Sequence, residues 1–416
     1  MLTSSLVSAQ NRVESPFIIV TMGNYTFGNC SDMESLQRMR RSFKVTYPNF
    51  MKSIRIVKVN GTVNTYTIVM EYAITEFDDP NLIDKILSSI SKSREIKISY
   101  GDWNAPAYIY KDEVAIISKI SSNVDMSASK ITYTISCTST ALSLKAGSFS
   151  FNACERKPSD VIKELLNNEA YGLKNIFTGM KNSTKVSLNN FIAGDDKVVR
   201  IDAKQSINIL DYLGYLVNCM ESQTHNGGNI KDANYFMAVY DDISNEYGGP
   251  YFKIVKVATG QTLPLSYSTY EVDVGYPSGS YVSSFTVDTD NAWSILYDYA
   301  QGVQQPQRSY SIDDNGQLIS SVSPVLMNSS KHLKTTATDK TWWTQVTQFP
   351  ITATITIKGL LRPALLMSSV KVNTFFYGRK HMSSGLYLIT RQEDSIDANG
   401  YKTTLRLLRT GGDANG

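Results

Sequence analysis

The segment Val114–Asp125, with the sequence VAIISKISSNVD, recurs near the C-terminus as Leu386–Asp397, with the sequence LYLITRQEDSID. The segments align without a gap, and the matched pairs are Ile117 with Ile389, Ser118 with Thr390, Lys119 with Arg391, Val124 with Ile396, and Asp125 with Asp397. A turn follows each segment, two residues shorter in the second copy, and then a matching run, ITYTISC at 131–137 and YKTTLRL at 401–407. These strand–turn–strand patterns predict two β-hairpins of the same design.

The repeat extends upstream of both hairpins. EIKISYG at 95–101 resembles SVKVNTFFYG at 369–378, and YTIVMEYAIT at 66–75 resembles ITATITIKGL at 351–360. Chance is the alternative explanation, because any two strand–turn–strand units look partly alike. Four consecutive elements in one order favour duplication, and we expect the two copies to lie side by side in space. They differ in one place, where a helix predicted at 80–92 becomes the Pro-interrupted LLRPALLM in the second copy.

The chain of 416 residues is long enough for two to four domains, because a single core stops growing at roughly 250–300 residues. The patterns predict an α+β fold that is mostly β, with two β-barrel or sandwich domains flanking a mixed α/β middle region. The expected divisions are a first β-domain at 1–150, a middle region of one or two small domains at 151–345, a second β-domain at 346–410 and a disordered tail at 411–416.

The middle region contains three predicted helices. The first opens at Lys157–Asp160 and runs to about Ala170, and Ser206 is expected to cap the second, which carries an apolar stripe. The third is predicted at 291–300. Residues 302–345 are rich in Gln, Ser and Thr and are expected to be mostly loops.

Composition excludes several classes of protein. A net charge of +3 is far from the basic excess of a dedicated nucleic-acid binder. The longest apolar run, 360–367, is interrupted by Arg362 and Pro363, whereas a membrane-spanning helix needs about 20 apolar residues. The first 20 residues carry no secretory signal. The cysteines, Cys30, Cys137, Cys154 and Cys219, form no CxxC pair and are expected to be reduced, as in a protein made in a cytoplasm and left unprocessed.

No catalytic, cofactor or metal site is predicted. His225, His332 and His381 are far apart in the sequence, so loop positions are a better reading than zinc ligands. Asp313–Gly316 lacks the order of a calcium loop and reads as a hairpin turn, as does Asn399–Gly400. The motifs GxSxG, HExxH and GxxxxGK[ST] are absent. We therefore expect a protein that is not an enzyme and has no cofactor.

Two surface features have alternative interpretations. Trp342 and Trp343 could form a carbohydrate platform, although a packed or interfacial anchor is the more ordinary role of such residues. The basic cluster of Arg38, Arg40, Arg41 and Lys44 could contact passing DNA, and a solvated or subunit-contacting face is the ordinary explanation.

Three stretches resemble the central hub proteins of phage tails and related contractile injection systems. They are DPNLIDKIL at 79–87 with IKISYG at 96–101, KPSDVIKELL at 157–166, and the C-terminal run from GLLRPALLMSSVKVN to SGLYLITRQEDSIDANGYKTTLRLLR at 359–409. The resemblance covers about half the chain. It implies a trimeric ring around an axial channel, in which each subunit carries two tail-tube-like β-domains, so that three subunits present six such domains to a six-fold tail tube.

The resemblance also implies partners and a location. The partners are two further copies of the chain, the tail tube or distal tail protein, and a three-fold central spike protein, with the tape-measure protein and transiting DNA as further candidates. The location is the tail or baseplate of a virion, assembled in the host cytoplasm. The alternative functions are a tail-tip cell-wall hydrolase, which would need an acid–base carboxylate pair, and a carbohydrate-binding tail protein.

Overall fold

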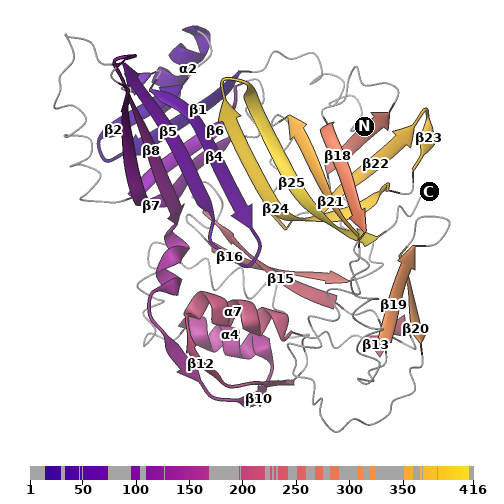
Figure 1. Ribbon diagram of the computed structural model, residues 1–416. Helices are drawn as coiled ribbons and strands as arrows, with labels where there is room; N and C mark the ends of the chain where they lie inside the picture. The colour runs from indigo at the N-terminus through magenta and orange to yellow at the C-terminus, as the bar shows by residue number, and fades with distance from the viewer. Residues whose placement is uncertain are drawn as a thin grey trace.

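The computed structural model describes most of the β-rich parts of the chain and is mostly β, as the sequence predicts. The described residues are 15–29, 33–45, 47–48, 50–73, 95–103, 109–125, 127–167, 196, 198–220, 225–226, 229–230, 233–241, 251–258, 268–274, 282–289, 307–312, 318–323, 351–358, 366–367, 369–381 and 383–411. Among these residues, the main feature is one sheet of 15 strands that draws on both ends of the chain (Figure 1).

The N-terminal part of this sheet is formed by the strands β1 (Pro16–Met22), β2 (Tyr25–Asn29), β3 (Tyr47–Pro48), β4 (Met51–Val59), β5 (Thr65–Ala73), β6 (Glu95–Asp102), β7 (Tyr110–Asp125) and β8 (Lys130–Ser139). The C-terminal part is formed by β17 (Ser268–Val274), β18 (Val282–Thr289), β21 (Ile351–Lys358), β22 (Ser369–Phe376), β23 (Arg379–Lys380), β24 (Gly385–Asp397) and β25 (Gly400–Gly411). β17 and β18 join this sheet although they come from within the predicted middle region.

The two parts have the same strand order. The first repeat unit, defined as β4–β5–β8–β7–β6–β1, corresponds strand for strand to the second repeat unit, β18–β21–β25–β24–β22–β17. All neighbouring strands within the two units are antiparallel except β17 and β22, which are parallel where the corresponding strands β1 and β6 are antiparallel. Shared strand order confirms that the repeat seen in the sequence is structural.

Both units also interrupt their strand pairing at matching places. In the first unit the pairing of β7 with β8 shifts between Ile117 and Lys119, and in the second the pairing of β24 with β25 shifts between Ile389 and Arg391. The bulged residues are Ser118 and Thr390, which the sequence alignment matches. A second pair of bulges, at Lys52 in β4 and Ser283 in β18, also corresponds. Bulges are specific features that re-aim a strand, so their recurrence strengthens the case for duplication.

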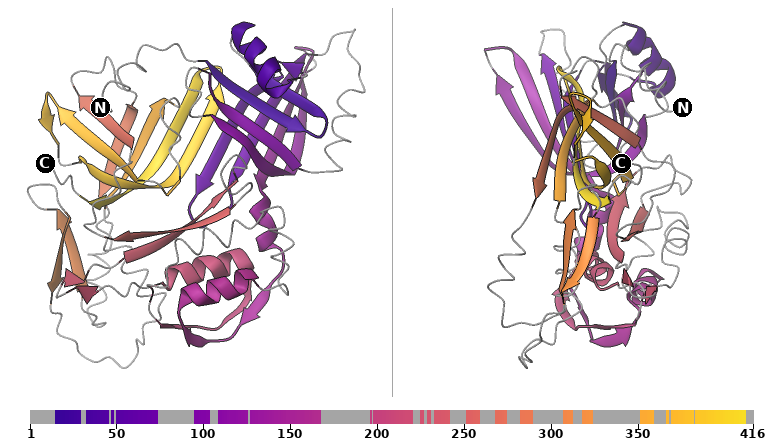
Figure 2. Two further views of the ribbon diagram at one scale, coloured as in Figure 1. Left: turned by 180° about the vertical axis from the view of Figure 1, so that it is seen from behind. Right: turned by 90° about the vertical axis from the view of Figure 1, so that its right-hand side faces the viewer.

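The two repeat units meet edge to edge. Arg391–Ile396 of β24 pair antiparallel with Ile54–Val59 of β4, which joins the units into one sheet (Figures 1 and 2). The expectation that the two ends of the chain lie side by side is therefore confirmed. Each unit has its own hydrophobic core, and Ile396 and Tyr401 of the second unit pack into the core of the first.

The middle region lies below the sheet in Figure 1. Its helices are α4 (Pro158–Asn167) and α7 (Ile209–Asn218), with the 3₁₀ helix η2 (Thr140–Lys145). Its strands are β9 (Phe149–Phe151), β10 (Cys154–Arg156), β11 (Val199–Ile201), β12 (Lys204–Ile207), β13 (His225–Asn226), β14 (Asn229–Ile230), β15 (Ala233–Tyr240), β16 (Tyr251–Ala258), β19 (Gln307–Ile312) and β20 (Leu318–Ser323). The two helices pack their apolar faces into a third core, which β15 and β16 also enter.

Three details differ from the sequence-based expectations. The N-cap of α7 is Asn208, whose side chain accepts a hydrogen bond from the Asp211 amide, and Ser206 lies in β12. A helix that was not predicted, α2 (Met33–Phe43), interrupts the N-terminal strands and buries Met39. Part of the region expected to be loops, 302–345, forms the hairpin β19–β20.

Other expectations lie outside the described residues. These are the helices at 80–92 and 291–300 and the tail at 412–416. In the described part of the chain, no helix has the length and apolar character needed to cross a membrane. Cys137, Cys154 and Cys219 are free thiols, as expected, and Cys30 is not described.

Candidate functional site: the seam between the repeat units

The seam is defined here as the pairing of Arg391–Ile396 in β24 with Ile54–Val59 in β4. Its register places Ile396 opposite Ile54, Asp394 opposite Ile56 and Gln392 opposite Lys58. The backbone pairing continues past the strand end, where the Asn60 amide donates a 3.1 Å hydrogen bond to the carbonyl of the bulged residue Thr390. The bulge of the second unit therefore lies at the end of the seam.

Charged and apolar contacts cross the seam on its two faces. On the more exposed face, the Arg55 guanidinium lies 2.7 Å from the Glu393 carboxylate, which Arg391 also contacts at 3.0 Å. The pKa of Glu393 is lowered, because burial, which alone would raise it, is outweighed by hydrogen bonds from the two arginines. On the buried face, Ile54 and Ile396 pack in the same core.

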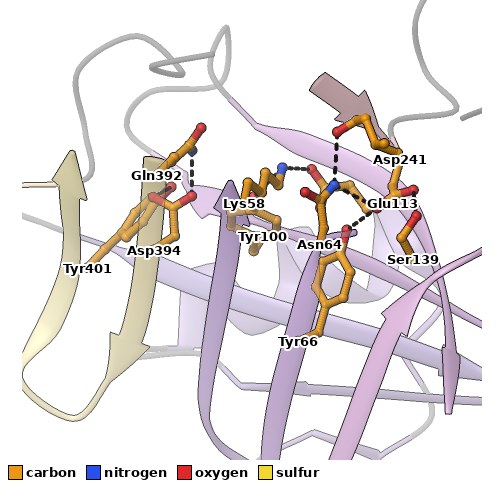
Figure 3. A network of polar contacts seen from close by, with 11 residues as sticks. Lys58, Asn64, Tyr66, Tyr100, Glu113, Ser139, Asp241, Gln392, Asp394 and Tyr401 are labelled. Carbon is orange, nitrogen blue, oxygen red and sulfur yellow. Dashed lines mark hydrogen bonds and ion pairs between the residues drawn. The ribbon is translucent and has the colours of Figure 1, made fainter. Parts of the chain in front are cut away.

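A buried cation lies beside the seam (Figure 3). Lys58 forms an ion pair with Glu113 of β7 and donates a 3.3 Å hydrogen bond to the Tyr100 hydroxyl. Burial alone would lower the pKa of Lys58, but the charge and hydrogen bond of Glu113, with the charges of Asp394 and Asp241, outweigh it and raise the pKa. Lys58 is therefore charged, and it links strands β4, β6 and β7.

Asp394 lies on the β24 side of the same network (Figure 3). Its carboxylate accepts hydrogen bonds from Gln392 at 2.6 Å, Thr403 at 2.6 Å and Tyr401 at 3.3 Å. Burial raises the pKa of Asp394, against the opposing effects of the Thr403 hydrogen bond and the Lys58 charge. A buried carboxylate is tolerated when such donors satisfy it, so Asp394 is held by side chains of its own unit at its place opposite Ile56 in the seam.

Asp241 attaches the middle region to the first repeat unit. Its carboxylate accepts hydrogen bonds from Asn64 at 2.8 Å, Tyr66 at 3.0 Å and Ser139 at 2.5 Å. Burial raises the pKa of Asp241. The pKa of Tyr66 is raised well above its usual value by burial and by the charges of Asp241 and Glu113. The Asp241 backbone carbonyl also accepts from the Val114 amide at 3.2 Å. These contacts tie the middle region to the first repeat unit beside the seam.

The residues singled out in the sequence do not converge on this network. Arg38, Arg40, Arg41 and Lys44 are exposed on or beside α2, where Arg38 pairs with Glu34. His381 is exposed and lies 2.8 Å from the Ser383 hydroxyl. The His225 side chain, His332, Trp342 and Trp343 lie outside what the structure describes. Within the described ranges, no three His, Cys, Asp or Glu residues are placed to hold a metal ion.

The two predicted turns have different outcomes. Asn399 and Gly400 form the turn of the β24–β25 hairpin, where the Asn399 amide donates to the Asp397 carboxylate at 2.7 Å and Gly400 has a φ of +105°. Residues 313–316 connect the paired strands β19 and β20, but the turn itself is not among the described residues.

The network was missed because no short motif contains it. A weak signal exists in the strand SIRIVKV at 53–59, where Lys58 alternates in phase with Ile54 and Ile56 and so falls on the apolar face. In RQEDSID at 391–397, Asp394 is likewise in phase with Ile396. A charge in phase with apolar neighbours indicates a buried partner, but the sequence does not say which one.

Comparison with known proteins gives distant structural similarities. No protein-family profile and no curated protein matches the chain. A tail protein from Neisseria meningitidis MC58 matches 95% of this chain and 96% of its own, with 11% identity and a TM-score of 0.49. The 43 kDa tail protein of prophage MuSo2 from Shewanella oneidensis matches 95% and 98%, with 11% identity and a TM-score of 0.47.

A type VI secretion component of E. coli, described as similar to T4 bacteriophage tail proteins, matches 86% of this chain and 73% of its own, with 7% identity and a TM-score of 0.43. These proteins belong to the class that the sequence resemblance indicates. Nothing about the assembly or partners of this chain follows from similarities at that distance.

Proposed function

We propose that this chain is a structural hub protein of a phage tail, of which three copies form a ring around an axial channel. The observation that carries the proposal is the edge-to-edge duplication, in which two β-units with one strand order share a single sheet. Three such chains place six similar units around one axis. A ring of this kind matches a six-fold tail tube on one face and a three-fold central spike on the other.

The contacts at the seam support this role. Arg55 pairs with Glu393 across the seam, and Ile396 and Tyr401 of the second unit pack into the core of the first. The Asp241 carboxylate accepts hydrogen bonds from Asn64, Tyr66 and Ser139 and so attaches the middle region to the first unit. A subunit that presents two copies of one binding surface needs a fixed angle between them, and these contacts restrict that angle.

The assigned partners are two further copies of the chain, the tail tube or distal tail protein, and the spike, with the tape-measure protein and transiting DNA as further candidates. The location is the virion tail, after assembly in the host cytoplasm. Mass measurement of the purified full-length chain tests the proposal, with three times the mass of one chain expected. A dimer, or a monomer that persists at high micromolar concentration, would contradict it.

A cell-wall hydrolase receives no support from the described carboxylates. Glu113, Asp241 and Asp394 are all buried and are held by neighbouring side chains, whereas a glycosidase needs two carboxyl groups that flank a sugar. The platform of Trp342 and Trp343 lies outside the described residues, so a carbohydrate-binding role has no observation in its favour. We expect the pure chain to give no cleared band on a peptidoglycan zymogram, and a clear band would overturn the structural assignment.

A further inference from the structure

We propose that residues 120–124 of β7 in one subunit pair antiparallel with residues 285–289 of β18 in a second copy of this chain. This contact, called here the subunit joint, would repeat the seam between neighbouring subunits. It rests on the proposed ring, and it specifies which two strand edges close that ring and in which register.

The first argument is that the edge of β24 that faces away from β25 pairs with two different strands. Its first residues, Gly385–Leu388, pair with β22, and its later residues, Arg391–Ile396, pair with β4 to form the seam. In the first unit, β7 has the matching early contact, because Val114–Ile116 pair with β6. The later part of β7, Lys119–Val124, pairs with β8 on one side and with none of the described strands on the other.

The second argument is a difference in exposure between matched residues. Ile396, buried at the seam, is 3% exposed, whereas its counterpart Val124 is 51% exposed. Unpaired strand edges with exposed apolar side chains readily add a further strand. β4 covers this position beside β24 in the second unit, whereas none of the described strands takes the matching place beside β7.

The missing strand is available at the opposite end of the sheet. β18 corresponds to β4, and it ends the sheet because β21 is its only partner among the described strands. Phe285 and Val287 are half-buried against the core of the second unit, while the alternate residues Thr286 and Asp288 are exposed. An edge with one apolar and one polar face is therefore presented to a neighbour.

The register of the joint follows from the register of the seam. β4 matches β18 through their shared pairing with β5 and β21, which sets Ile54 equivalent to Phe285 and Ile56 equivalent to Val287. Replacing each seam residue by its counterpart gives the pairs of the joint. They are Val124 with Phe285, Asn123 with Thr286, Ser122 with Val287, Ser121 with Asp288, and Ile120 with Thr289.

The chemistry of these pairs is complementary. Val124 and Phe285 provide an apolar pair on the face that is buried at the seam, and Lys119 lies diagonal to Asp288 on the other face, within reach of a long side chain. The buried charges of the seam are not repeated, because Lys58 corresponds to Thr289 and Asp394 to Ser122. The joint is therefore less polar than the seam on its buried face.

Heterologous contacts of this kind close into rings when the rotation between copies allows it. A disulfide test reads the register directly, because a disulfide needs Cα atoms about 4.4–6.8 Å apart. In the full-length double variant Asn123→Cys/Thr286→Cys, the cysteines face each other across the joint. We expect mild oxidation to give a covalent trimer on a non-reducing gel. The matched control Asn123→Cys/Asp288→Cys is two residues out of register and should remain monomeric on the same gel.

A second measurement separates this inference from the proposed ring. Val124→Glu should shift the native trimer to monomer, whereas Val198→Glu, at another exposed valine (62%), should leave the trimer intact. A native trimer that Val124→Glu does not weaken, or in which the out-of-register control crosslinks better, would overturn the subunit joint and leave the ring standing. A wild-type chain that stays monomeric would overturn both.

Discussion

At the scale of single residues, Lys58 is the buried cation of the seam strand β4. It is buried with Glu113, and removing one member of a buried ion pair leaves an uncompensated charge. We predict that Lys58→Met lowers the free energy of unfolding by about 3–5 kcal/mol. Urea denaturation followed by tryptophan fluorescence would measure the change.

A matched control lies on the same strand. Lys52 pairs with Glu71 at 2.6 Å, but its side chain is 58% exposed. Lys52→Met should therefore cost about 0–1 kcal/mol, as exposed ion pairs usually do. The double variant Lys58→Met/Glu113→Leu should recover part of the loss, since neither charge is then left alone. Equal effects of the two lysine substitutions would contradict a structural role for the buried pair.

Ionisation of the Tyr66 hydroxyl makes the free energy of unfolding depend on pH in the alkaline range. Burial, together with the Asp241 and Glu113 charges, raises the pKa of Tyr66 well above its usual value. The Tyr66 hydroxyl ionises near pH 10 in the unfolded chain but stays protonated to higher pH in the folded chain. Its contribution to the free energy of unfolding is therefore fully present below pH 10 and is lost as the pH rises above that value. We predict that Tyr66→Phe reduces the slope of unfolding free energy against pH by up to about 1.4 kcal/mol per pH unit above pH 10.

Chemical denaturation of wild type and Tyr66→Phe at several values between pH 8 and pH 11 would measure this difference in slope. Lys58, whose pKa is also raised, contributes a loss in the same direction in both proteins. An identical slope in both proteins would show that Tyr66 does not titrate differently on folding.

At the scale of elements, the two bulges are the most specific trace of the duplication. The Ser118 hydroxyl donates to the Ser136 carbonyl at 2.9 Å, and the Thr390 hydroxyl donates to the Arg406 carbonyl at 3.3 Å. The donors and the acceptors occupy equivalent positions in the two units. The same side-chain hydrogen bond thus accompanies the extra residue in each hairpin.

We predict that Ser118→Ala and Thr390→Val each lower the free energy of unfolding by about 0.5–1.5 kcal/mol, the usual net value of one hydrogen bond. Thr390→Ser keeps the hydroxyl and should lie closer to wild type than Thr390→Val. Thermal and urea unfolding of the three variants would check this. If Thr390→Val and Thr390→Ser were equally stable, the bulge would not depend on its side-chain hydrogen bond.

Much of the element pattern could be predicted, for physical reasons that differ along the chain. Ser53–Val59 and Ile351–Lys358 alternate apolar and polar residues, so their strands follow from period two. Ser121–Asp125 has Val124 as its single apolar residue, and its strand pairs with β8 along its whole length. The N-cap of α7 is Asn208, two residues after the predicted Ser206, because both residue types can cap a helix and the local sequence does not distinguish between them.

The seam could be predicted in outline but not in detail. The repeat indicated that the two ends lie together, and it gave the correct alignment of Ser118 with Thr390. It did not indicate that Lys58, Glu113 and Asp241 would meet, because these residues come from strands and loops far apart in the sequence. Long-range polar pairing depends on strand order, which the sequence pattern leaves open.

At the scale of the whole molecule, the central claim is that three chains close a ring of six similar β-units. The seam sets the step between the units of one chain, and the subunit joint would repeat this step between chains. Repetition of one step around an axis pairs the open edge of β7 with β18 of the next subunit, which removes the hazard of open-ended pairing at these two edges.

Electron microscopy of the purified full-length chain tests this claim most directly. We predict top views of a ring with three-fold symmetry in which the two β-units of each subunit alternate at about 60° steps around an open channel. A dimer, an open filament, or a three-fold ring whose two β-units lie at different radii would contradict the account.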